Sequence, residues 1–199
     1  MIVQFFLLSL FVLLTAFAIR FSYRQFYRFP NRTERDVASF LVPVDLGELM
    51  DLVDALTEEI MWHELEPREL RKVQLKRLRL LLTYTRWMRH NGDVLQEWGE
   101  YGYRRRHYAQ EDGIKSCSLG LVKACRQFRF GSRSVQFDLH IKFVKLKLFP
   151  SRPVPRLSRL RRIDASFDLL FAYQSIRIAA EYLSQAYGED CYQSLAKTL

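Results

Sequence analysis

The sequence contains little glycine and little proline, with 8 and 6 residues in a chain of 199. Their combined share lies well below the roughly 12% that is usual in proteins, which predicts few loops. Leucine supplies 30 residues against 20 for valine and isoleucine together, and leucine favours helices where β-branched residues favour strands. We therefore exclude an all-β fold and predict an all-α protein. Because 49% of the residues are hydrophobic, we also exclude a disordered chain.

The sequence also lacks the residue patterns that enzymes and metal centres require. It has no glycine-rich phosphate loop, nucleophile elbow or zinc-protease motif. His63 follows Glu59 by four residues, whereas metal sites in helical bundles need Glu-x-x-His from two helices. The cysteines are Cys117, Cys125 and Cys191, and their low, odd number indicates a reducing compartment. The sequence shows no base positioned to activate any of them, so we expect structural thiols. We expect no catalytic residues, no cofactor and no metal.

Residues 2–19 contain no charged side chain. A helix over this segment is ~27 Å long, nearly the thickness of the hydrocarbon core of a bilayer, so a single transmembrane helix is predicted. No Lys or Arg precedes the segment and Arg20 follows it directly. This asymmetry places the N-terminus outside and the rest of the chain in the cytoplasm, at the inner (plasma) membrane. A signal peptide cleaved after Ala16-Phe17-Ala18 and a buried soluble helix are the alternatives.

Arginines follow the apolar segment at intervals of four residues, with aromatic side chains between them. They are Arg20, Arg24 and Arg28. On a continued helix they lie along one face at the level of the headgroups, where guanidinium groups bind anionic phosphates. Ordinary anchoring without lipid selectivity is the alternative. We assign residues 1–30 to a transmembrane anchor with this belt and residues 31–199 to a cytoplasmic helical bundle.

The prolines lie where helices start or stop, and long antiparallel helices are predicted between them. Capping residues and apolar spacing predict helices over 33–41, 45–65, 67–103 with a kink at Asn91-Gly92, and 155–188. Residues 121–149 are ambiguous, because apolar and polar residues alternate from Val135 to Phe143. A β-hairpin that turns at Gly131-Ser132 is the alternative. A helix is preferred because residues 121–130, the nearby candidate for the second strand, alternate poorly.

Charges of opposite sign are concentrated in consecutive segments. Residues 43–66 carry eight acidic residues and no Lys or Arg, while residues 67–90 carry eight basic residues and one acidic residue. The short connection at Pro67 predicts that these two segments form antiparallel neighbouring helices. Their apolar stripes provide the stability, and the opposite charges select the partner.

The basic block 115–162 carries thirteen Lys and Arg residues against one acidic residue, and it is the candidate anion-binding surface. Arg156, Arg159 and Arg162 recur every three residues at the start of the last expected helix. Cations there oppose the helix dipole, which indicates a compensating anionic partner. Anionic lipid is the expected partner. Acidic side chains of 45–65, a solvated surface and nucleic acid are the alternatives.

These features together predict a membrane-anchored helical scaffold or interaction module at the cytoplasmic face. Contact of the basic surface with anionic lipid is a hypothesis beside that of a solvated surface, and the sequence identifies no protein partner. The alternative is a membrane-associated nucleic-acid-binding protein that uses the basic segment 115–162.

Overall fold

The computed structural model describes residues 15, 16, 19, 37–104, 111–149, 156–157 and 168–198. The chain divides into two units, Met1–Thr33 and Glu34–Leu199, and the second contains all the elements described below. Apart from residues 15, 16 and 19, the expected membrane helix lies outside the described residues, as do Arg20, Arg24 and Arg28. Among the residues that are described, no helix has the length and apolar character needed to cross a membrane.

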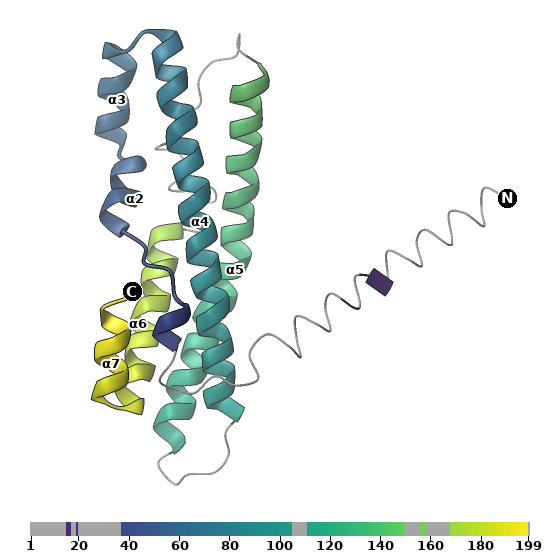
Figure 1. The fold of residues 1–199 in the computed structure, drawn as a ribbon, viewed down its shortest axis with the longest axis vertical. Coiled ribbons are helices and arrows are strands. Elements are labelled where there is room, and N and C mark those ends of the chain that lie inside the picture. The colour runs from purple at the N-terminus through teal and green to yellow at the C-terminus, as the bar shows by residue number, and fades with distance from the viewer. Residues whose placement is uncertain are drawn as a thin grey trace, which may run out of the picture. The chain divides into compact units, whose positions relative to one another are not determined.

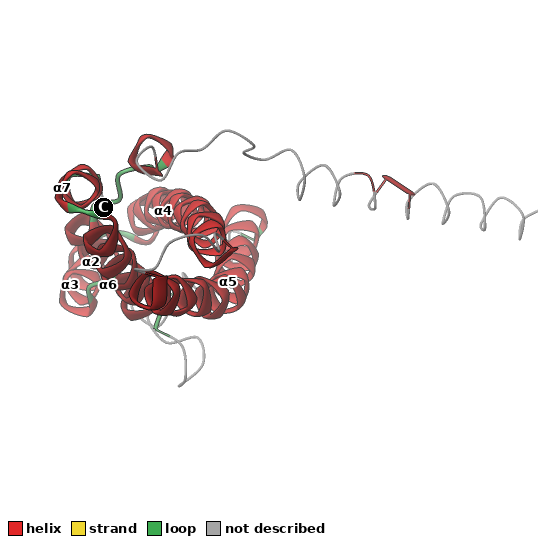
Figure 2. Ribbon diagram, turned by 90° about the horizontal axis from the view of Figure 1, so that it is seen from below, coloured by secondary structure: helices red, strands yellow, loops and turns green. Residues whose placement is uncertain are grey.

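Every element in the described part of the second unit is helical, which confirms the prediction of an all-α bundle. The order is η1 (Val37–Phe40), a 3₁₀ helix, then α2 (Leu46–Leu52), α3 (Ala55–Glu64), α4 (Pro67–Arg104), α5 (Glu111–Leu148), α6 (Leu169–Tyr187) and α7 (Glu189–Ala196) (Figure 1). The two longest helices, α4 and α5, contain 38 residues each and form an antiparallel hairpin. Both Figure 1 and Figure 2 show α2, α3, α6 and α7 toward one side of this hairpin.

Helix α5 confirms the helical interpretation of residues 121–149, and the hairpin alternative is wrong. Phe137 is 69% exposed, although Val135 and Leu139 on either side of it are buried. The alternation that resembled a strand therefore arises because α5 has a second, exposed apolar face. The buried face follows helical spacing and includes Leu121, Cys125, Phe128, Val135 and Leu139.

Helix α4 continues without interruption through Asn91-Gly92, which confirms the predicted continuation, while the kink expected there stays a prediction. A Cβ at Gly92 would lie 3.4 Å from the ring of Phe128, so this glycine belongs to the packed interface with α5. Asn91 is fully buried and forms hydrogen bonds with Val42, in the segment between η1 and α2, and with Tyr173 of α6. The Asn-Gly pair thus serves the packing of α4 rather than its termination.

The single helix expected over 45–65 is wrong, because the chain leaves helical geometry at Val53 and Asp54. Asp54 is the N-cap of α3, and its carboxylate accepts a hydrogen bond from the backbone N–H of Thr57 at 2.7 Å. Hydrogen bonds with Thr57 hold the pKa of Asp54 below its ordinary value. A capping residue in the middle of the predicted helix therefore starts a new helix.

The guanidinium of Arg77, from α4, binds the end of α2 at this break. It donates to the carbonyl oxygens of Asp51 and Leu52 at 3.3 and 2.6 Å. Carbonyls in the last turn of a helix lack their usual intrahelical partners, and that of Asp51 also accepts from the Asp54 N–H at 3.4 Å. Burial lowers the pKa of Arg77, and the nearby carboxylates of Glu58 and Asp54 oppose this shift. A side chain from α4 thus stabilises the interruption between α2 and α3.

The expected antiparallel pairing of the acidic segment with α4 is confirmed. Gln74 donates to the carboxylate of Glu58 at 2.9 Å, and further along α4 the hydroxyl of Tyr84 donates to Glu48 in a short hydrogen bond. Residue numbers rise along α4 as they fall along α3 and α2, which defines antiparallel helices. Selection of the partner by opposite charge stays a prediction.

The last long helix begins later than the position expected near Pro155. Arg156 and Leu157 are not helical, and α6 begins after Asp168, whose carboxylate accepts hydrogen bonds from the first backbone N–H groups of the helix. The end at Gly188 was predicted correctly. Its φ of +123° lies in the range that favours glycine, and it separates α6 from α7, which the sequence did not predict.

Candidate lipid- and anion-binding surface

Arg156 is bound to α3 rather than placed in the first turn of a helix. Its guanidinium lies 3.0 Å from the Glu59 carboxylate and 5.3 Å from the centroid of the Trp62 ring. An acidic residue of α3 therefore compensates this arginine, which was one of the alternatives weighed from the sequence. Arg159 and Arg162 lie outside the described residues.

The position of Arg156 is fixed by its neighbour. Leu157 is fully buried, and its backbone N–H donates to Glu58 at 2.5 Å. The Glu58 side chain is 1% exposed and also accepts the hydrogen bond from Gln74. A buried carboxylate must be hydrogen-bonded, and here its donors come from α4 and from the chain after α5. This cluster holds residues 156–157 against the bundle.

An exposed apolar face runs along most of α5. Phe130, Phe137 and Val144 recur every seven residues, close to two helical turns, so they lie on one face. Leu119 and Leu148 extend this face toward either end of the helix. The five side chains are 51, 76, 69, 46 and 62% exposed in the order 119, 130, 137, 144, 148, and we call them the α5 stripe.

Exposed cations accompany the α5 stripe. Lys123 precedes Phe130 by seven residues, so it lies on the same face as the stripe, between Leu119 and Phe130. Arg126 precedes Phe130 by four residues and Arg133 precedes Phe137 by four, so each lies one turn before a stripe residue. A helix face that carries both exposed apolar side chains and cations matches the boundary between anionic headgroups and acyl chains. The sequence pointed to this region through the charge of residues 115–162 alone. The signal it also held, a seven-residue spacing of exposed apolar side chains, was missed.

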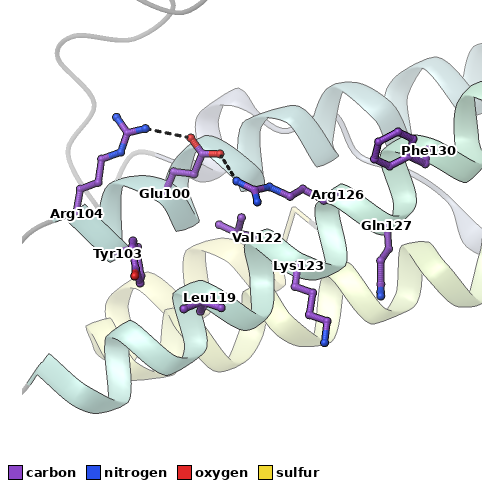
Figure 3. Close-up of a pocket in the computed structure, with 9 residues that line it drawn as sticks. All are labelled: Glu100, Tyr103, Arg104, Leu119, Val122, Lys123, Arg126, Gln127 and Phe130. Carbon is purple, nitrogen blue, oxygen red and sulfur yellow. Dashed lines mark ion pairs between the residues drawn. The ribbon is translucent and has the colours of Figure 1, made fainter.

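A groove of about 650 Å³ lies between the C-terminal end of α4 and the N-terminal half of α5 (Figure 3). Leu119 and Phe130 belong to it, so it opens beside the α5 stripe. We call it the α4–α5 groove, and its lining consists of Glu100, Tyr103, Arg104, Leu119, Val122, Lys123, Arg126, Gln127 and Phe130.

The polar part of the α4–α5 groove is centred on Glu100. Its carboxylate lies 3.7 Å from the guanidinium of Arg104 and 3.7 Å from that of Arg126, as the dashed lines in Figure 3 mark. Gln96 donates to the same carboxylate at 2.9 Å. Lys123 adds a third cation to the lining, so three cations and one carboxylate give the groove a formal charge of +2.

No family model, curated protein or solved structure matches the chain. Function is therefore inferred from charge, exposure and shape at the α5 stripe and the α4–α5 groove.

Glycines of α4 set how closely α4 and α5 approach beside the groove. A Cβ at Gly99 would lie 3.0 Å from Val122 and 3.2 Å from the carbonyl oxygen of Ser118. A Cβ at Gly102 would lie 2.6 Å from the Ser118 hydroxyl and 2.5 Å from that of Tyr187. Because Val122 lines the α4–α5 groove, the absence of a side chain at Gly99 fixes the position of this wall.

Cys125 and Cys191 are buried in the bundle, and Cys117 is half-buried. Cys117, Cys125 and Cys191 form no disulfide, and burial raises the pKa of the Cys125 thiol, which opposes formation of the nucleophilic thiolate. His63 lies 3.4 Å from Glu59 near the surface. Within the described ranges, no group of three or more His, Cys, Asp or Glu side chains is placed to hold a metal ion. The absence of catalytic activity stays a prediction.

Proposed function

We propose that the protein is a membrane-anchored helical interaction module whose bundle contacts anionic lipid at the cytoplasmic face of the inner (plasma) membrane. Residues 2–19 form the anchor in this proposal, with Arg20, Arg24 and Arg28 at the headgroups. The lack of charge in the segment and the arginines after it support this part. The bundle adds a second contact with the membrane, through α5.

The observation that carries the lipid contact is the α5 stripe. Large exposed apolar side chains that gather on one face of a protein mark sites of interaction, and the five side chains of the stripe share one face of α5. Complete burial of one such side chain contributes ~1.5–3 kcal/mol, and each cation near an anionic leaflet contributes ~1 kcal/mol. The apolar side chains and cations of one helix face therefore reinforce each other at an anionic membrane.

The composition of the α5 stripe favours lipid over nucleic acid. Leu119, Val144 and Leu148 have no aromatic face on which a base can stack, and they have no polar group for a phosphate. A membrane accepts these side chains among its acyl chains. The anchor also holds the bundle at high effective concentration near headgroups, so a weak surface suffices. Binding of nucleic acid through residues 115–162 is the alternative outcome.

The test uses a fluorophore that reports polarity, attached to the full chain in vesicles at Phe137→Cys. The native half-buried thiol is removed by Cys117→Ser. We expect a blue shift of emission in vesicles that contain phosphatidylglycerol, little shift in pure phosphatidylcholine, and a smaller shift at high salt. Phe171→Cys is the matched control, because Phe171 is 70% exposed but lies on α6.

Two results contradict the lipid contact. One is equal emission of the label at residue 137 in anionic and neutral vesicles. The other is an equal shift for the label at residue 171, which indicates a contact without a preferred face. A blue shift at residue 137 caused by added DNA or RNA, and not by anionic lipid, favours the nucleic-acid alternative.

A further inference from the structure

We infer that the α4–α5 groove binds a single-chain anionic amphiphile, a molecule with one alkyl chain and a negatively charged head. The lining places apolar side chains next to cations, which correspond to the two parts of such a ligand. The inference goes beyond the proposed function. The α5 stripe meets a lipid surface, whereas the groove holds one molecule and needs no anionic bilayer.

The apolar walls of the groove accept the alkyl chain. The groove volume of about 650 Å³ lies within the roughly 300–1,000 Å³ of sites that bind small molecules. Tyr103, Leu119 and Phe130 are 46, 51 and 76% exposed, so a ligand removes apolar surface that now faces water. A phospholipid with two acyl chains is larger than this volume, which favours a ligand with one chain.

The cations of the groove select an anionic head. Arg104 and Arg126 already compensate the charge of Glu100, and Lys123 remains as an additional cation in the lining. The Arg126 side chain is 63% exposed, and a guanidinium has five N–H donors, so contact with Glu100 leaves donors for a ligand. A carboxylate and a phosphate share the chemistry that this arrangement recognises.

The same charges disfavour other occupants. A second copy of the chain brings the same cations to the interface, and like charges repel. A neutral apolar helix fills the walls but makes no use of Lys123 and Arg126. Nucleic acid satisfies the cations but leaves the walls formed by Leu119 and Phe130 in water. An anionic amphiphile is complementary to both parts of the lining.

The experiment uses the full chain in nanodiscs of phosphatidylcholine. This lipid has no net charge, so docking of the α5 stripe on anionic lipid does not contribute to the labelling. Hexadecanoic acid that carries a diazirine is added, light joins it to nearby residues, and mass spectrometry locates the modified peptides. We expect modification concentrated between residues 119 and 130 and competed by unlabelled hexadecanoate. The methyl ester of the probe has no charge, and we expect it to modify these peptides several-fold less.

Matched variants separate the groove from the rest of the helix face. Phe130→Ser removes part of a groove wall, whereas Phe137→Ser removes an aromatic ring that is 69% exposed on the same face outside the groove. We expect roughly tenfold less modification for Phe130→Ser and no change for Phe137→Ser. Lys123→Gln and Arg133→Gln form a second pair, with a loss of roughly two- to fivefold for Lys123→Gln alone.

A second arm distinguishes the source of the ligand. A photoactivatable lysophosphatidylglycerol, placed in the nanodisc beforehand, replaces the added acid. Modification of the groove by the acid alone identifies a free carboxylate amphiphile, and modification by the lysolipid identifies a ligand drawn from the membrane. Both results support a groove that binds one alkyl chain with an anionic head.

Three results overturn the inference. They are equal modification by the acid and its ester, equal losses in Phe130→Ser and Phe137→Ser, and modification spread evenly along α5. Failure of the fluorophore at residue 137 to detect anionic vesicles rejects the proposed lipid contact and leaves the groove result unaffected.

Discussion

The side-chain amide of Asn91 pairs with both backbone polar groups of Val42, 49 residues earlier. It accepts from the Val42 N–H at 2.8 Å and donates to the Val42 carbonyl at 2.7 Å. The amide nitrogen also donates to the hydroxyl of Tyr173 at 2.8 Å. One side chain therefore joins α4 to the segment between η1 and α2 and to α6.

Asn91→Leu is expected to lower the free energy of unfolding of the Glu34–Leu199 unit by about 3 kcal/mol, because three polar groups lose their partner inside the protein. Tyr173→Phe removes one of the three hydrogen bonds, and we expect a loss of about 1 kcal/mol. Urea unfolding followed by circular dichroism measures both values. Equal losses in the two variants would show that the contacts with Val42 contribute nothing.

Arg156→Gln is expected to lower the free energy of unfolding by about 1 kcal/mol, through loss of the exposed ion pair with Glu59 and the contact with Trp62. Contact with anionic vesicles should not change. Arg133→Gln, beside the α5 stripe, is the matched control and should weaken the vesicle contact without loss of stability. If Arg156→Gln weakened the vesicle contact and Arg133→Gln did not, Arg156 rather than α5 would contact the lipid.

Charge reversal in the acidic segment should depend on burial. Asp51 is exposed, so Asp51→Lys is expected to cost less than about 1 kcal/mol, and more at low salt than at high salt. Glu58 is buried, so Glu58→Lys should destabilise the bundle by about 3 kcal/mol or more at any ionic strength. Unfolding at two salt concentrations measures the difference. A strong salt dependence for Glu58→Lys would contradict this distinction.

Tyr84 should make stability depend on pH in the alkaline range. Its hydrogen bond to Glu48, with burial, raises the pKa of Tyr84 from 10.0 to about 12. The protonated hydroxyl is the donor, so this stabilisation is complete below pH 10 and is lost as the pH rises through about 12. Tyr84→Phe should lose less stability over this range. Parallel curves of urea midpoint against pH for both proteins would exclude the effect.

The proposed topology predicts which positions an impermeant thiol reagent reaches in intact cells. Cys191 is buried and is a poor reporter, so Phe171→Cys is used instead, at a position that is 70% exposed. We expect this cysteine to be labelled only after the membrane is permeabilised, and Ile2→Cys to be labelled in intact cells. Labelling of Phe171→Cys in intact cells would reject the cytoplasmic position of the bundle.

Local sequence features predicted the long helices but not the break in the acidic segment. Pro67 marked the start of α4, and the apolar spacing that follows it marked the length of the helix. Leu49, Val53 and Leu56 keep helical spacing across the break, so the apolar pattern does not reveal it, and the N-cap residue Asp54 was missed as a start signal. The Leu52 carbonyl at the end of α2 accepts a hydrogen bond from Arg77, on another helix, and no local pattern contains that contact.

For the candidate site, the sequence supplied the cations but not their arrangement. Arg156 faces Glu59 because the next residue along the chain is tied to Glu58, which follows from tertiary structure alone. The α4–α5 groove depends on the close approach of Gly99 to Val122, and these residues belong to different helices. Residue types and spacing indicate what a surface carries, whereas packing decides which cations remain available.

The hydrogen bond between Glu58 and Leu157 joins residues 99 apart, across the whole length of the α4–α5 hairpin in the sequence. Neighbouring helices find each other early in folding, while contacts that close long loops form late. An interaction absent from the transition state slows unfolding and leaves the folding rate unchanged. We therefore expect the α4–α5 hairpin to form first and residues 156–157 to dock on α3 last.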